Sequence, residues 1–349
     1  MVEAAASNRR LKPAEWVALP DEKLLDVRMC DLGGLSISGS DLRRRIRKVE
    51  RELKRRGLRF RPRYWLSDEW FTPDGVPGVA IPFYLAHPRL AKLEMAQMLE
   101  VEGADEATCL RILRHEVGHA LDNAYDLRRR PTRRRLFGNP RTEYPEYYTP
   151  KPYSKSYVQH LDSWYAQSHP DEDFAETFAV WLEHESDWAT HYKGWPALRK
   201  LEYMDKLMRE LSRRATVVKS KRVVDPLPRL RKTLREHYRK RREHYGTDHP
   251  DVYDRALRNL FSDSPVFAGK PAADKFVAKI RKEVRTTVAS FTDSYQYTID
   301  QLLDRIINRC RDLNLHLMDT EKATKADFMV FLTVQTMNYL HSGRHRVAL

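Results

Sequence analysis

Cysteine is scarce in this sequence of 349 residues. Its three cysteines, Cys30, Cys109 and Cys310, are odd in number and far apart in the chain. That spacing excludes a disulfide framework, which needs paired cysteines, and a Cys-rich zinc module, which needs clustered ones. A reducing compartment is the expected environment, and we expect the protein to be cytoplasmic.

Long apolar runs are missing as well. No stretch approaches the roughly 20 consecutive apolar residues that a membrane span requires. The N-terminal residues 1–17 include basic side chains but lack the apolar run of a secretory signal. We therefore expect a soluble protein without a membrane partner, and the hydrophobic share of 41% is enough for a large buried core.

Acidic residues are outnumbered by basic ones. The 63 Lys and Arg residues against 49 Asp and Glu residues give a formal net charge of +14. Net charge bears on association rather than on fold, and this value favours an acidic partner. Basic runs such as Arg43 to Arg45 and Arg239 to Arg242 could contact phosphates, but no named nucleic-acid-binding motif accompanies them. Nucleic acid is therefore the lesser alternative as a partner.

The first 100 residues give mixed signals. Residues 1–40 are poorly patterned and form an N-terminal lead-in. Apolar residues then recur at helical spacing from Leu42 to Leu53, and Gly57 is the expected stop. Residues 58–66 alternate as in a strand, whereas the apolar run 79–85 is interrupted by a proline at position 82, which is typical of an edge strand.

Helices are expected to dominate the remainder. A long helix is predicted from near Asp105 to Leu127, and residues 128–152, rich in Arg, Pro and Tyr, suggest a long surface loop. Prolines break the segment 217–228, which we interpret as a linker. The other predicted helices are residues 157–165, 170–185, 196–214, 230–245, 252–261, 274–289, 297–315 and 325–340.

The long helix carries the pattern His115-Glu116-Val117-Gly118-His119. Residues four apart project from one face of a helix, so both imidazoles can bind one ion. Glu116 directly follows His115 on the helix, so its carboxylate is within reach of a water bound to that ion. This is the geometry of the H-E-x-x-H motif, in which two histidines hold zinc and the glutamate acts as general base.

A catalytic zinc usually has three protein ligands, so one more must come from elsewhere. Asp122 stands where an extended motif would need a glycine, and no histidine follows in the next turn. The acidic cluster of residues 171–176 is the better source. Within it Glu172 and Glu176 share a helix face, so one carboxylate could reach the metal while the other lies behind a ligand histidine.

These segments resemble the glutamate zincins, in particular a bacterial group of zinc-binding metallopeptidases and, more distantly, the catalytic domain of anthrax lethal factor. The resemblance covers roughly residues 57–185. It implies that Glu172 is the third ligand and that Glu176 orients a ligand histidine. It also implies that Tyr165, seven positions before Glu172, donates to the developing oxyanion, although simple packing explains this tyrosine equally well.

Asp122 has two readings of equal weight: it hydrogen-bonds a ligand histidine, or it caps a helix neighbour. The basic-run histidines His237 and His244 lack a carboxylate at ligand spacing and are expected to be surface residues.

The fold class expected from these signals is α+β. A zincin-like domain over residues 41–216, with a small, mostly antiparallel sheet and the active-site helix, precedes the linker 217–228 and a helical domain over residues 229–349.

The expected function is a zinc metallopeptidase that hydrolyses a peptide or protein substrate, which the basic surface suggests is acidic. The alternative is a non-hydrolytic zinc-containing binding module, associated with nucleic acid or another anionic partner. The intact Glu116 favours the enzyme, since a binding module needs no base.

Overall fold

A computed structural model describes residues 10–145, 147–148, 151, 154–162, 164–184, 186–245, 254–292, 294–341 and 347–348. The chain divides into two compact units. One comprises the residues up to Gln97 together with Val101–Arg239, and the other comprises Met98–Glu100 and Lys240–Ala348. The described part of the chain contains no helix with the length and apolar character needed for a membrane crossing.

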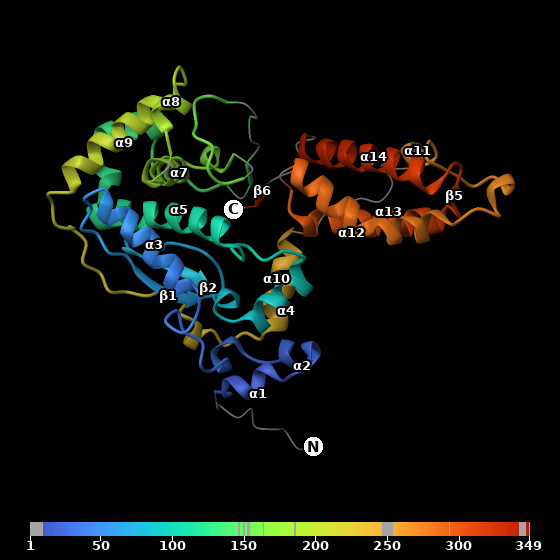
Figure 1. The fold of residues 1–349 in the computed structure, drawn as a ribbon, viewed down its shortest axis with the longest axis horizontal. Helices are drawn as coiled ribbons and strands as arrows, with labels where there is room; N and C mark the ends of the chain where they lie inside the picture. The colour runs from blue at the N-terminus through green and yellow to red at the C-terminus, as the bar shows by residue number, and fades with distance from the viewer. Residues whose placement is uncertain are drawn as a thin grey trace. The chain divides into compact units, whose positions relative to one another are not determined.

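Helices dominate the first unit (Figure 1). They are α1 (Pro13–Val17), α2 (Asp21–Leu25), α3 (Leu42–Arg55), α4 (Pro88–Met98), α5 (Glu106–Tyr125), α6 (Pro131–Phe137), α7 (Pro170–Leu182), α8 (Trp188–His191), α9 (Leu198–Leu211) and the start of α10 (Leu234–Tyr245). Short 3-10 helices are η1 (Met29–Asp31), η2 (Phe83–Ala86), η3 (Leu127–Arg129), η4 (Tyr165–Gln167) and η5 (Leu227–Arg229). The strands are β1 (Arg63–Ser67), β2 (Gly78–Pro82) and β3 (Tyr147–Tyr148).

The expectation of a mostly antiparallel sheet is wrong for β1 and β2, which pair in parallel with Arg63 opposite Gly78. Residues 68–77 carry the chain back to the start of β1 instead of closing a hairpin. On the other side of β2, the amide of Ala80 donates to the carbonyl of Phe71 at 2.9 Å. Every residue of β2 is buried and the strand ends at Pro82, so the edge strand predicted over residues 79–85 is shorter than expected and is not exposed.

Several connecting segments also differ from the expectation. The lead-in folds into α1, α2 and η1, with Trp16 and Leu24 fully buried. The expected loop after α5 contains η3 and α6, which begins at Pro131, a residue whose fixed φ suits the first helical position. A helix was predicted over residues 157–165, but the described residues 157–162 and 164 are irregular, and η4 begins at Tyr165. Helix α4, which begins at Pro88, is not among the helices predicted from the sequence.

The predicted linker 217–228 packs onto the first unit rather than separating two domains. The amide of Val217 donates to the carbonyl of Ala124 at 2.9 Å, and the Trp65 indole donates to the carbonyl of Val224 at 2.8 Å. Leu227 is buried. The division between the units therefore falls inside α10, eleven residues after the end of the predicted linker.

The second unit is a helical bundle with its own apolar core. Its elements are α11 (Asp254–Leu257), β4 (Phe261–Ser262), η7 (Pro265–Phe267), α12 (Ala273–Thr292), α13 (Gln296–Asp312), β5 (His316–Leu317), α14 (Glu321–His341) and β6 (Val347–Ala348). Strands β4 and β5 pair in antiparallel fashion. Arg281 on α12 donates to Asp300 on α13 at 2.7 Å, which fastens these two helices together.

Helix α5 lies between α3 and α7 in the first unit (Figure 1). It begins at a cap, because the Asp105 carboxylate accepts from the amide of Thr108 at 2.9 Å. It ends where Asp126 adopts a positive φ of 51°. Arg114 on α5 donates to Glu52 on α3 at 2.9 Å, so this edge of α5 faces α3.

Gly118 lets α7 approach α5 closely. A Cβ atom at this position would lie 3.0 Å from the Cα atom of Ala175 and 3.1 Å from its carbonyl oxygen. Those neighbours are backbone atoms, which can move only if the whole helix moves. The residue inside the His-Glu-Val-Gly-His pattern therefore sets the distance between the two helices.

We expect Gly118→Ala to destabilise the first unit by about 1 kcal/mol. Overpacking of a core costs about 1 to 3 kcal/mol, and the better helix propensity of alanine returns about 1 kcal/mol. Gly118→Val should cost more. Denaturant unfolding followed by tryptophan fluorescence measures this unit alone, because all 7 tryptophans precede residue 196. A Gly118→Ala protein more stable than wild type would contradict the packing described.

Candidate metal centre

The two motif histidines lie side by side on one face of α5. Their Nε2 atoms are 3.0 Å apart and their ring centroids are 4.8 Å apart. His115 is buried, whereas the His119 side chain remains 11% exposed. The four-residue spacing on a helix is sufficient to produce this arrangement.

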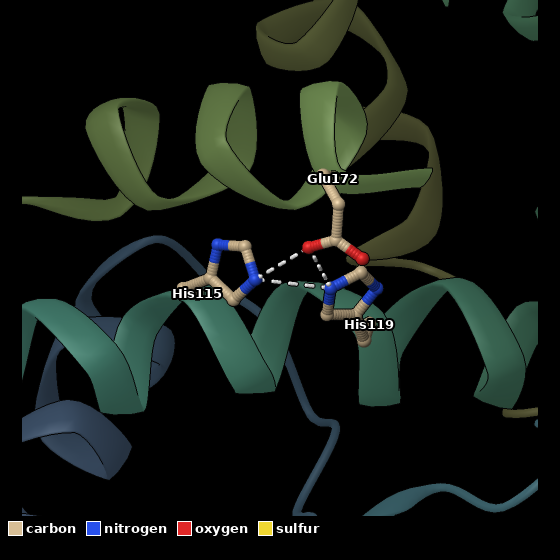
Figure 2. A group of neighbouring side chains, drawn as sticks. All are labelled: His115, His119 and Glu172. Carbon is tan, nitrogen blue, oxygen red and sulfur yellow. Dashed lines mark hydrogen bonds and ion pairs between the residues drawn. The ribbon is translucent and has the colours of Figure 1, made fainter. Parts of the chain in front are cut away.

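Glu172, in the first turn of α7, completes a cluster of three possible metal ligands (Figure 2). Its Oε2 atom lies 2.9 Å from Nε2 of His115 and 3.0 Å from Nε2 of His119. Two imidazole nitrogens and a carboxylate oxygen thus converge on one point. This donor set suits Zn²⁺, which binds histidine and carboxylate ligands at about 2.0 to 2.2 Å.

Glu176 lies one turn further along α7, behind His115. Its Oε1 atom is 2.7 Å from Nδ1 of His115, and its Oε2 atom accepts from the amide of Leu161 at 2.8 Å. A proton on Nδ1 leaves the lone pair of Nε2 free to face the cluster. The carboxylate therefore fixes both the orientation of the ring and the nitrogen that is available to a metal.

A proton and a metal ion would compete for the same imidazole nitrogens. Burial lowers the pKa of His115, but the hydrogen bonds and charges of Glu172 and Glu176 outweigh it and raise that pKa well above its usual value. Burial raises the pKa of Glu172, but the neighbouring His119 and His115 hold it well below its usual value. A metal ion must displace protons from the imidazoles, so its affinity should fall as the pH falls.

Glu116 lies beside the cluster without belonging to it. Its Oε2 atom accepts from the Thr72 hydroxyl at 2.8 Å, and this hydroxyl also lies 3.1 Å from the Glu116 carbonyl oxygen. Thr72 comes from the segment between β1 and β2, far from the motif in sequence. Sequence reasoning missed it because a lone threonine in a loop carries no signal.

Tyr165 lies against His115, with ring centroids 5.5 Å apart in an edge arrangement. Trp164 immediately before it has a positive φ of 52°, and the chain then enters η4. The predicted oxyanion donor is therefore adjacent to the cluster, at the entrance to α7.

A second tyrosine, Tyr144, touches a candidate ligand directly. Its hydroxyl donates to Oε1 of Glu172 at 2.8 Å, and its ring stacks on His169 with centroids 3.7 Å apart. Burial and the charges of Glu172 and Asp171 raise the pKa of Tyr144, so the phenol stays protonated and donates. The sequence offered one hint, the tyrosine-rich stretch that begins at this residue, but nothing singled out Tyr144 within it.

Asp122 takes neither of its two predicted roles in the contacts that the structure describes. Its Oδ2 atom accepts from Nη2 of Arg133 at 2.7 Å, and the same Nη2 lies 2.6 Å from Asp171 Oδ1. Arg128 adds a contact to Asp171 at 2.9 Å. Burial raises the pKa of Asp122, although both arginines oppose this. The reason for the difference is α6, which inserts the fully buried Arg133 between α5 and α7.

All four carboxylates between residues 171 and 176 are buried, because α7 is buried on every side. Asp173 is matched by Lys200 on α9, whose Nζ atom lies 2.6 Å away. Burial still raises the pKa of Asp173 to about 7. The acidic cluster thus divides into Glu172 and Glu176, which face imidazoles, and Asp171 and Asp173, which bind α7 to neighbouring helices.

Residues 92–219 match the model of a protein family described as "Putative zinc-binding metallo-peptidase". The match covers less than half of the chain and includes both motif histidines and all of α7. It ends before Lys240, where the main part of the second unit begins. Comparisons with curated proteins and with solved structures found no match.

We expect Arg133→Met to destabilise the first unit by about 3 to 5 kcal/mol, since it leaves Asp122 buried beside Asp171 without their shared partner. Arg135→Met removes an exposed arginine two residues away and should change stability by less than about 0.5 kcal/mol. Tryptophan-monitored unfolding compares the two variants. Equal stability of Arg133→Met and wild type would show that the contacts of Arg133 with Asp122 and Asp171 do not stabilise the fold.

Proposed function

We propose that the first unit is a zinc-dependent peptidase in which His115, His119 and Glu172 hold the metal. The observation that carries this proposal is the convergence of three donor atoms within about 3.0 Å of one another, beside a carboxylate that is not one of them. The family match over residues 92–219 and the resemblance to glutamate zincins support it.

A bound zinc ion supplies Lewis acidity, which lowers the pKa of water towards 7 and polarises a substrate carbonyl. The carboxylate of Glu116, oriented by Thr72, takes a proton from the attacking water and passes it to the leaving amine. Tyr165 is adjacent to His115 and donates to the developing oxyanion.

Tyr144 has a different part in this proposal. Because its hydroxyl binds Oε1 of Glu172 while Oε2 faces the histidines, Oε2 is the oxygen that Glu172 would offer to a metal. Tyr144 thereby positions a ligand, whereas Tyr165 donates a hydrogen bond to the substrate. The distinction between the two tyrosines can be measured.

The zinc content of variants tests the assignment of the metal ligands. The full-length protein should bind about one zinc per chain, and His115→Ala or His119→Ala should lose it. Glu172→Ala should bind zinc more weakly, and Glu176→Ala should lose about 10- to 100-fold in affinity because the ring of His115 is no longer fixed. Elemental analysis and competition with a chelating dye measure these effects.

Glu183→Ala is the matched control for that series. Glu183 follows α7 directly, but its carboxylate faces Arg114 at 2.7 Å instead of the histidines. Equal zinc content in the control, Glu172→Ala and both histidine variants would remove the ligand assignment.

Tyr144→Phe should lower zinc affinity about 10-fold, because Glu172 loses the hydrogen bond that orients it. Tyr165→Phe should leave zinc affinity unchanged and lower kcat, because an oxyanion donor acts in the transition state. Dye competition measures the first effect without any substrate. Unaltered zinc affinity in Tyr144→Phe would show that the hydroxyl does not position the ligand.

Glu116→Gln should keep the zinc and the fold but lose a factor of about 10² to 10⁴ in turnover, because the amide cannot accept the proton. The assay uses a broad peptide library with acidic and neutral members. Glu143→Gln neutralises an exposed carboxylate near Tyr144 and should retain full activity. If zinc-loaded Glu116→Gln cleaves a peptide as fast as wild type, Glu116 is not the base.

A further inference from the structure

A groove of about 820 Å³ lies between the exposed face of α3 and the extended segment that follows it. We call it the basic groove. Glu50 is the acidic residue in its lining, and the buried apolar residues Leu58 and Phe60 also contribute to it. Its basic lining residues are Arg43, Arg44, Arg47, Arg51, Lys54, Arg59 and Arg61.

Most of these cations have no carboxylate partner within the protein. Arg44 is the exception, because it forms ion pairs with Glu106 and Asp41. In the ranges that the structure describes, the other six form no ion pair, and all six are exposed. Like charges gathered in one hollow repel one another, so the groove has an electrostatic potential that an anion would relieve.

The cations lie in two rows. Arg43, Arg47 and Arg51 recur every fourth residue along α3, which places them about 6 Å apart along one helix face. Arg59 and Arg61 lie two residues apart in the extended segment, where that separation corresponds to about 7 Å. The evenly spaced arginines along α3, together with the arginine pair that follows the helix, fit a polymer with regularly repeated negative charges.

We propose that the basic groove binds the phosphate backbone of a nucleic acid. Arginine outnumbers lysine six to one in the lining, and its planar guanidinium is suited to two-point contacts with phosphate. Contacts of this kind read charge rather than base sequence, so the binding is sequence-independent.

A second hollow of about 680 Å³ adjoins the basic groove and shares Arg43, Arg47 and Glu50 with it. Tyr64 lines this hollow, and its buried hydroxyl has no hydrogen-bond partner among the described residues. A bound nucleotide chain that extends from the groove would enter this hollow and lie beside Tyr64.

The groove is less suited to a membrane surface. Helices that bind membranes expose large apolar side chains next to their basic ones. The apolar face of α3, with Leu42, Ile46, Val49 and Leu53, is buried inside the unit instead. The exposed large apolar residues found in the described ranges lie outside the lining of the groove.

The groove and the metal centre share no lining residue, and α3 contacts the edge of α5 that carries Arg114. The basic groove therefore binds nucleic acid independently of the zinc cluster and of the proposed peptidase activity.

The test measures binding of the full-length protein to a fluorescein-labelled single-stranded oligonucleotide of about 20 nucleotides, longer than the usual site of a single-strand binder. The groove variant is Arg43→Gln, Arg47→Gln and Arg51→Gln combined. Because each phosphate contact contributes about 0.7 to the salt slope, the variant should lower that slope by about 2 and weaken binding roughly 100-fold at about 0.1 M salt.

The matched control combines Arg199→Gln, Lys206→Gln and Arg213→Gln, which removes the same charge from exposed positions on and just after α9. It should bind like wild type. Circular dichroism checks that both variants fold, and zinc content should not change in either.

Three results would overturn the proposal: absence of binding by the wild type, equal losses in the groove variant and the control, or undiminished binding by the groove variant. The assignment to nucleic acid would also fail if polyglutamate, or vesicles containing phosphatidylserine, bound wild type more tightly than the oligonucleotide and lost that binding in the groove variant.

Discussion

The close approach of α7 to α5 is the constraint on which the metal centre depends. At Gly118 the two helices pass so near that a Cβ atom would lie 3.0 Å from the Cα atom of Ala175. Glu172 precedes Ala175 by three residues, nearly one turn, and His115 precedes Gly118 by the same number. A wider separation of the helices would move the Glu172 carboxylate away from both imidazoles, because its side chain is too short to compensate. The glycine is thus a geometric requirement of the site rather than an incidental spacer.

This approach has an electrostatic cost, because it buries the acidic start of α7. The structure offsets the cost by giving each carboxylate a cationic or imidazole partner. Asp171 meets Arg133, Asp173 meets Lys200, and the two glutamates meet the histidines. Buried charges are tolerated only when they are paired and hydrogen-bonded. The scaffold and the site are therefore built from alternate members of one acidic cluster, and a change in either disturbs the other.

Local patterns predicted much of this arrangement, and contacts distant in sequence account for the rest. Helix α5 with its start near Asp105 and the amphipathic α3 follow from local patterns, as does the shared face of Glu172 and Glu176. Thr72, Tyr144 and Arg133 could not be found in this way, because each acts through a partner at least eleven residues away. The prediction of antiparallel pairing was wrong for β1 and β2 for a similar reason. A turn sequence at residues 74–78 indicates a change of direction, but only the packing of the whole segment decides which edge the chain returns to.

The central claim is that His115, His119 and Glu172 hold one zinc ion. A crystal structure of the zinc-loaded full-length protein, with diffraction data collected on both sides of the zinc absorption edge, tests it most directly. We expect a single anomalous peak about 2.0 to 2.2 Å from Nε2 of each histidine and from Oε2 of Glu172, with Glu116 outside ligand distance. A peak ligated by other residues, or no peak between these three side chains at full zinc occupancy, would contradict the account.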